Sequence, residues 1–290
     1  MPESSSKAGS TVQIYPPANT TNMNIQSIIK AIEIADKDVQ ERFSPRRKVL
    51  KDFFNMGTKF TVAALPLAFG SLFAKAYGKV PDAVLDLLNF GLSLEYFEFT
   101  YYDTALKVAG LVNPKDNLVV IRDHERQHVK FLTEAIKASG GTPVTIGKYD
   151  FTAKGIFSDV FTNYRTFLHV AQAFEDTGVR AYKGQAGHLL SAKPVLQAAL
   201  QLHSVEARHA AHIRFARRMN GFDTTVRPWI VGDDHSKGTP LAAVYKGEGN
   251  HIQAGVDISQ FKVGDADTSG FDEPLSKEEV LAIVKPFFVV

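Results

Sequence analysis

The chain has 290 residues, of which 44% are hydrophobic and 22% are charged, and its formal net charge is +2. These values are typical of a globular protein with a sizeable core, and the small net charge gives no electrostatic reason to expect a nucleic-acid partner. The sequence contains no cysteine, which excludes disulfides, thiolate chemistry and cysteine-ligated iron–sulfur clusters. A bound metal would therefore take oxygen and nitrogen ligands.

Residues 1–80 predict an N-terminal extension. Residues 1–22 are rich in Ser, Thr and Pro, as mobile tails are, and residues 23–52 predict an amphipathic helix. The apolar run 60–74 is shorter than the about 18 uninterrupted apolar residues of a spanning helix, so no integral membrane segment is expected.

The segment before this apolar run has features of an export signal. Arg46 and Arg47 precede the run, and Ala74-Lys75-Ala76 follows it, a pattern that resembles a twin-arginine signal with a cleavage site. The pattern favours a periplasmic protein, although the long leader before Arg46 is atypical. The alternative is a cytoplasmic protein in which an N-terminal helix packs on the rest of the chain.

Residues 81–220 predict four helices, because apolar residues recur there at helical spacing. The expected helices span about residues 81–110, 114–139, 158–184 and 192–220. Short links within the first pair and within the second pair make the partners antiparallel neighbours. Residues 140–157 can extend about 60 Å at roughly 3.3 Å per residue, which exceeds the about 42 Å length of such a helix, so they can cross over along a bundle.

Residues 221–290 have few helical patterns and predict an irregular tail that packs on the bundle. A contact in a homo-oligomer is the alternative role for this tail. Ser276 and Glu279 have the spacing of a capping box, which predicts a short helix from Lys277 to Val284, ended by Pro286.

The second and fourth predicted helices each carry a Glu-x-x-His motif on the apolar face. One motif runs from Glu125 to His128 and the other from Glu206 to His209. Residues three apart on a helix project together, so each pair can reach a single ion. A carboxylate among apolar side chains is costly unless it is paired, protonated or bound to a cation. The pattern favours metal binding; the alternative is a buried hydrogen-bonded network without metal.

The first and third predicted helices complete a repeated unit. Glu95 lies 30 residues before the first motif, and Glu175 lies 31 residues before the second. A tyrosine follows each of these glutamates by seven residues, at Tyr102 and Tyr182. Four carboxylates and two imidazoles in a duplicated pattern are what two metal ions inside a four-helix bundle require. Each tyrosine is either a hydrogen-bond partner of a ligand or an ordinary buried tyrosine.

Other side chains near the motifs have weaker patterns. Glu248 and His251 have the same spacing but lie in a Gly-rich segment that disfavours a helix, so this is interpreted as a chance match. Glu98 could replace Glu95 as a ligand, but its spacing to the first motif breaks the repeat. His203 and His212 could flank the site, although ordinary roles are commoner for such residues. His124 is expected to point off the ligand face. Arg180 and Arg208 could balance the charge of the carboxylates, but surface ion pairs are expected for them.

Residues 81–220 resemble the ferritin-like superfamily of di-iron and di-manganese carboxylate proteins. Within it, the chain is similar to the ferritin-like domain proteins related to plant desiccation-related and fungal stress-response proteins. The similar segments are LNFGLSLEYFEFTYY (88–102), EDTGVRAY (175–182), EARHAAHIR (206–214) and FDEPLSKEEVLAIVKPF (271–287). The resemblance implies an all-α, antiparallel ferritin-like four-helix bundle with a long crossover between helices two and three.

The resemblance also implies roles for the six metal-ligand candidates. The terminal carboxylates would be Glu95 and Glu175, the bridging carboxylates Glu125 and Glu206, and the imidazole ligands His128 and His209. This set suits two iron or manganese ions, and ligand type alone does not exclude zinc.

Two classes of function are consistent with such a site. The first is an oxidoreductase of peroxidase, catalase or ferroxidase type, which reacts with peroxide or dioxygen in stress protection. The alternative is a non-catalytic stress or structural protein in which the metal only stabilises the bundle. Iron storage is a weaker hypothesis, because the large N- and C-terminal additions do not suit a ferritin-type shell. The sequence assigns no catalytic acid or base.

Overall fold

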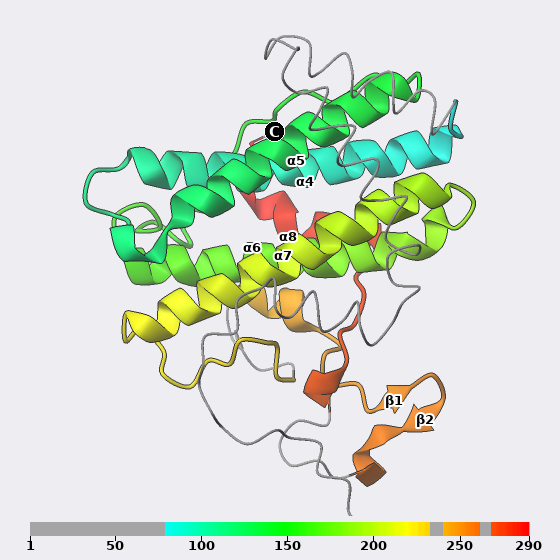
Figure 1. Cartoon of the computed structure of the whole chain (residues 1–290). Helices are drawn as coiled ribbons and strands as arrows, with labels where there is room; N and C mark the ends of the chain where they lie inside the picture. Colours follow the sequence, from blue (N-terminus) through cyan, green and yellow to red (C-terminus); the bar gives the residue numbers. More distant parts are fainter. Residues whose placement is uncertain (1–78, 233–239, 262–267, 290) are drawn as a thin grey trace, which may run out of the picture. The chain divides into compact units, whose positions relative to one another are not determined.

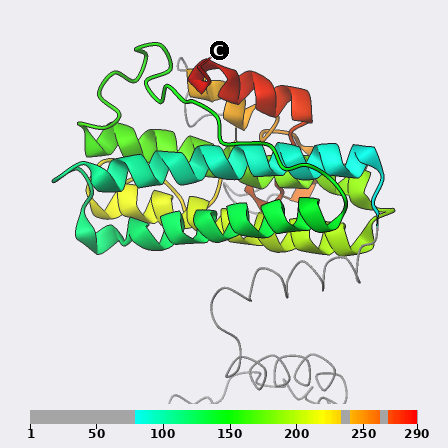
Figure 2. The same cartoon turned by 90° about the horizontal axis from the view of Figure 1, so that it is seen from above.

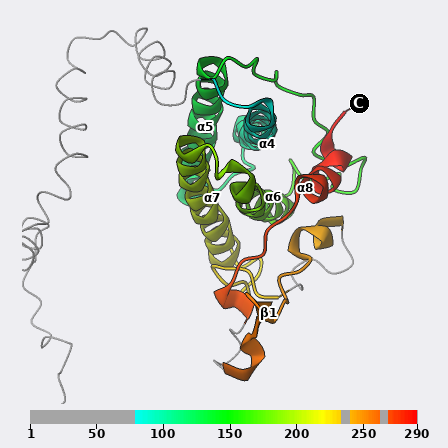
Figure 3. The same ribbon diagram turned by 90° about the vertical axis from the view of Figure 1, so that its right-hand side faces the viewer.

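The structure is a computed structural model that describes residues 79–232, 240–261 and 268–289. Four long helices dominate these residues (Figure 1). They are α4 (Asp82–Lys107), α5 (Leu118–Ala138), α6 (Tyr164–Ala186) and α7 (Lys193–Met219). Viewed end-on, the four helices surround a common axis (Figure 3). The predicted all-α bundle is confirmed.

All of the described residues lie in the second of two units of the chain, residues 65–290. The helix expected at 23–52 and the twin-arginine pattern lie outside the described residues. Within the described ranges, no helix is both long and apolar enough to cross a membrane.

Two helices begin later than the sequence predicts, and each start has a local cause. Asn163 has an extended backbone, and its Oδ1 accepts a 3.1 Å hydrogen bond from the amide of Arg165, so α6 begins at Tyr164 rather than near 158. Asn117 adopts a left-handed conformation with φ of 52°, which separates a short 3-10 turn from α5. The link between α5 and α6 is correspondingly longer than expected.

This link and the C-terminus close one side of the bundle with aromatic side chains. Phe97 on α4 packs against Phe174 on α6 with ring centroids 4.5 Å apart. Phe151 of the link and Phe288 of the C-terminus pack on the same Phe97 ring, at 5.2 and 5.8 Å. Segments that are distant in the sequence are therefore held together by one apolar cluster.

The predicted C-terminal helix is confirmed. Helix α8 spans Lys277–Val284 and begins with the capping box formed by Ser276 and Glu279. It packs on α6, along the outside of the bundle (Figure 2). A short antiparallel hairpin, β1 (Ile252–Gln253) and β2 (Val256–Asp257), precedes it.

Arg180 on α6 is the main polar attachment of the tail, which corrects its prediction as a surface residue. Its side chain is 1% exposed, donates 2.7 Å hydrogen bonds to the carbonyls of Lys246 and Glu273, and pairs with Glu248 at 2.9 Å. One turn further, a Cβ on Gly184 would lie 1.9 Å from the carbonyl oxygen of Leu275. The tail thus passes directly against the α6 backbone.

Candidate metal centre

The six metal-ligand candidates converge from all four helices. Glu95 comes from α4 and Glu175 from α6, while α5 and α7 each contribute a Glu-x-x-His pair. All four carboxylate side chains are fully buried, and the two imidazoles are nearly so. Glu95 lies one turn from the buried Leu92 on α4, and His128 lies one turn from the buried Leu132 on α5.

These side chains form two groups that overlap. One group is Glu95, Glu125, His128 and Glu206, and the other is Glu125, Glu175, Glu206 and His209. Within each group, one potential ligand atom from every side chain lies within 4.8 Å of the others. Glu125 and Glu206 belong to both groups.

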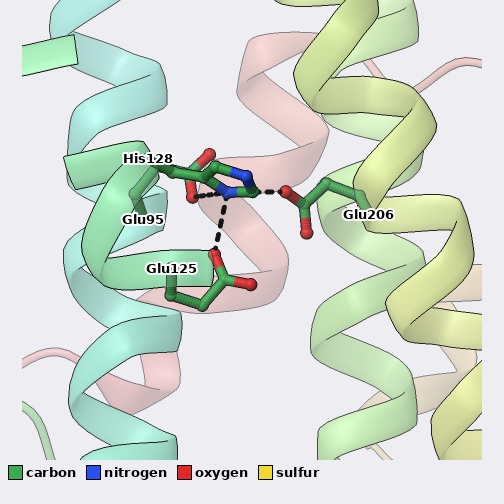
Figure 4. Close-up of side chains that lie close together, drawn as sticks. All are labelled: Glu95, Glu125, His128 and Glu206. Carbon is green, nitrogen blue, oxygen red and sulfur yellow. Dashed lines mark hydrogen bonds and ion pairs between the residues drawn. The ribbon is translucent and has the colours of Figure 1, made fainter. Parts of the chain in front are cut away.

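His128 lies at the centre of the first group (Figure 4). Its Nδ1 is 3.0 Å from Oε2 of Glu95 and 3.2 Å from both Oε2 of Glu125 and Oε1 of Glu206. Three carboxylates from three helices thus face one imidazole nitrogen.

His209 has the corresponding position in the second group. Its Nδ1 is 2.8 Å from Oε1 of Glu125 and 3.4 Å from Oε2 of both Glu175 and Glu206. The two imidazole rings lie 6.1 Å apart, centroid to centroid. The repeat in the sequence is therefore also a repeat in space.

Several of these buried atoms have no hydrogen-bond partner among the described residues. They are Oε1 of Glu125, Oε2 of Glu175, both carboxylate oxygens of Glu206, and Nδ1 of His209. The ion-pair contacts bring these atoms close without the alignment that a hydrogen bond needs. Leaving such atoms unsatisfied is costly, and a cation between them would satisfy all of them. The arrangement therefore fits bound metal.

Electrostatics support the same reading. Burial, reinforced by the nearby charge of Glu206, raises the pKa of Glu125. Burial raises the pKa of Glu175 to about 7. Burial would also raise the pKa of Glu206, but the close contacts with His128 and His209 lower it to about 2. Burial alone would lower the pKa of both imidazoles, yet the surrounding carboxylates raise it far above its usual range. Without metal, protons must provide the positive charge that balances the carboxylates.

Each tyrosine contacts a glutamate of the other half, Glu175 or Glu95. The hydroxyl of Tyr102 on α4 donates a 2.5 Å hydrogen bond to Oε1 of Glu175 on α6. The hydroxyl of Tyr182 on α6 donates to Oε1 of Glu95 on α4. These contacts leave the second oxygen of each glutamate facing an imidazole.

Glu98 lies beside the site but outside both groups. It is 4% exposed, and burial together with the charges of Glu206 and Glu175 raises its pKa well above the usual range. Its Oε1 is 3.1 Å from the position of a Cβ on Gly178. Gly178 lies three residues after Glu175, as Glu98 does after Glu95, so the two residues occupy equivalent positions in the repeat. The sequence therefore indicates that the two halves differ here, with a carboxylate in one half and a glycine in the other.

His124 is closer to the site than expected. Its Nδ1 lies 3.0 Å from Nε2 of His209, and the two rings stack with centroids 5.2 Å apart. The prediction that this side chain points off the ligand face overlooked the nitrogen of His209 that faces outward. The equivalent position in the other half is Val205. No local pattern marks such a contact between helices.

The remaining candidates lie elsewhere. Nδ1 of His203 is 2.9 Å from the carbonyl oxygen of Val179, and Nε2 of His212 is 2.6 Å from that of Asp116. Glu248 pairs with Arg180 under the tail, so the third Glu-x-x-His match contributes nothing to this site.

The comparisons with known proteins agree with this geometry. No curated protein is similar enough to the chain to match it. The family described as "Ferritin-like domain" matches residues 83–218, which are the four helices and the candidate metal centre. Residues 83–218 therefore form a domain of the ferritin-like superfamily.

Proposed function

We propose that the six buried side chains bind two metal ions, iron or manganese, and that the pair reacts with an oxygen species in stress protection. The observation that carries the proposal is the overlap of the two groups. Glu125 and Glu206 belong to both, so each is suited to bridge two ions. Glu95 and His128 would complete one coordination shell.

Glu175 and His209 would complete the other shell. Four carboxylates balance the charge of two divalent cations, which would remove the need for protons in the site. Oxygen and imidazole ligands suit iron and manganese. When bound, two such ions supply Lewis acidity and redox equivalents to an oxygen substrate.

The chain's own residues would orient these ligands and keep out water. Tyr102 and Tyr182 each hold one oxygen of a terminal glutamate, which directs the other oxygen toward the site. All four carboxylate side chains are 0% exposed, so the bundle excludes bulk water from them.

Elemental analysis of the protein purified from its native source tests the proposal, together with anomalous scattering at the iron and manganese edges. We expect two metal ions per chain and loss of both in the double variant Glu125→Ala and Glu206→Ala. The matched control is Glu134→Ala with Glu278→Ala, which removes two carboxylates that belong to neither group. Full metal occupancy in the variant that lacks Glu125 and Glu206 would show that these two side chains do not bridge the ions.

The complete burial of the ligands also favours the second candidate, a metal that only stabilises the bundle. A chelator distinguishes the two functions. If the metal leaves only on unfolding and the loaded protein reacts with neither dioxygen nor peroxide, the role is structural. Exchange from the folded protein, with reaction, supports the first function.

A further inference from the structure

The bundle contains an apolar cavity of about 30 Å³ next to the candidate metal centre. Residues of all four helices line it, among them Leu88, Gly91, Leu132, Tyr182, Ala198 and Leu202. Gly91 is one turn before Glu95 on α4, and Tyr182 donates its hydroxyl hydrogen bond to Glu95. The Tyr182 side chain thus forms the wall shared by the cavity and the metal-binding residues.

The lining has the wrong chemistry for a polar ligand. Among the described residues that line it, only Tyr182 and Gln185 have polar side chains, and the Tyr182 hydroxyl already donates to Glu95. A buried water requires about 2–4 polar partners, and peroxide has similar hydrogen-bonding needs. The volume exceeds the roughly 10–15 Å³ that a water-sized molecule occupies, so a small apolar diatomic molecule fits where water is poorly held.

At two positions that line the cavity, the other half of the repeat carries larger side chains. By the repeat, Phe167 stands where Leu87 lines the cavity, and Tyr101 stands where Ala181 lines it. The two aromatic rings stack with centroids 4.8 Å apart, and both side chains are 0% exposed. At these two positions, the half that contains the cavity therefore has smaller side chains than the other half.

We propose that this cavity binds dioxygen and holds it beside Tyr182 and Glu95. The inference rests on the proposed function and narrows its substrate from an oxygen species to dioxygen, because an apolar lining discriminates against peroxide. Entry of dioxygen is thereby assigned to the half of the site that contains Glu95 and His128.

Xenon, an apolar atom of similar size, tests the cavity without any metal. Crystals of the full-length protein pressurised with xenon should show one xenon atom between Leu132 and Ala198. They should show none between Tyr101 and Phe167. An empty cavity under xenon would overturn the proposal even if the metal site is active.

Rates of iron(II) oxidation test the ligand. Ala198→Val places two methyl groups in the cavity, and Gly91→Ala adds a Cβ at ordinary contact distance, 3.5 Å from the Tyr182 hydroxyl oxygen. In the iron(II)-loaded protein, each variant should react several-fold more slowly with dioxygen and at unchanged rate with hydrogen peroxide. Ala207→Val, an exposed change on the same helix, is the matched control and should alter neither rate.

The outcomes separate the two proposals. Equal slowing with both oxidants, or no slowing with dioxygen, would overturn the cavity as a dioxygen site. If the wild-type protein loaded with iron(II) reacts with neither oxidant, the proposed function is wrong. The proposal that the cavity binds dioxygen as a substrate then also fails, whatever the xenon experiment shows. Gly91→Ala keeps the test decisive if Ala198→Val fails to fold.

Discussion

The hydroxyl of Tyr102 donates a 2.5 Å hydrogen bond to Oε1 of Glu175 across the bundle, from α4 to α6. Tyr182 and Glu95 repeat this contact in the opposite direction, from α6 to α4. Each terminal ligand candidate is therefore oriented by the helix that carries the other one. These two hydrogen bonds link the halves of the site to each other.

Replacing Tyr102 by Phe should weaken metal binding in the half that contains Glu175. The substitution removes one hydroxyl and frees the carboxylate to rotate, and loss of such a partner costs about 10–100-fold in metal affinity. Competition with a chelator measures this loss. Tyr164→Phe, which removes the 2.7 Å hydrogen bond to Asp116 outside the site, is the control. Equal affinities in both variants would contradict the orienting role.

The metal-free protein should lose stability as pH rises from about 4.5 to about 7. Burial raises the pKa of Glu175 from 4.5 to about 7, so folding favours its protonated form. That stabilisation is complete below the unfolded pKa and is lost as pH passes the folded pKa. The change is on the order of 3 kcal/mol, from about 1.4 kcal/mol per pKa unit. The raised pKa of His128 and of His209 acts in the same direction above about pH 6.5.

Chemical unfolding at several pH values measures this dependence. Glu175→Gln should flatten it, because the amide does not titrate. Added manganese(II) or anaerobic iron(II) should reverse it, since metal competes with protons for the same carboxylates. A flat profile for the metal-free wild type would contradict the raised pKa of Glu175.

His124→Val should affect one metal position and spare the other. His124 is the outward partner of His209, whereas the other half has Val205 at the equivalent position. Because such partners fix the orientation of a ligating imidazole, we expect a loss of about 10-fold at the site containing His209. Stepwise metal titration resolves the two positions. His203→Val, which removes a histidine outside the site, is the matched control.

Glu98→Gln should retain both metals, whereas Glu95→Gln should lose one. Glu95 lies 3.0 Å from Nδ1 of His128, while Glu98 belongs to neither group of ligand atoms. Because the pKa of Glu98 is raised, this side chain is expected to be protonated, and an amide is close to it in shape and charge. Metal content after dialysis compares the two variants. Loss of metal in Glu98→Gln but not in Glu95→Gln would mean that Glu98, and not Glu95, is the ligand.

Gly184→Ala should displace the tail. The added Cβ would lie 1.9 Å from the carbonyl oxygen of Leu275, and backbone cannot move aside as a side chain can. We expect destabilisation of about 1–3 kcal/mol and faster proteolysis of the tail. Urea unfolding and timed digestion provide the measurements. For Gly187→Ala, the added Cβ would have no heavy atom within 4 Å, and this control should behave as wild type.

The sequence by itself determined the four helices, the six ligand candidates and the capped C-terminal helix. These features are local or periodic: apolar residues three or four apart define a helix face, and Ser276 with Glu279 defines a helix start. The repeat of Glu95 and Glu175 about 30 residues before each motif added the only long-range information that a sequence can show directly.

Only the tertiary structure decided which groups meet across helices. Three such features depend on how the helices are rotated and spaced. They are the contact of His124 with His209, the hydrogen bonds from Arg180 to the tail, and the cavity beside Tyr182. The packing of many side chains sets that rotation and spacing, and no short pattern encodes them. Helical periodicity therefore places a residue on a face, and the packing of all four helices determines what that face touches.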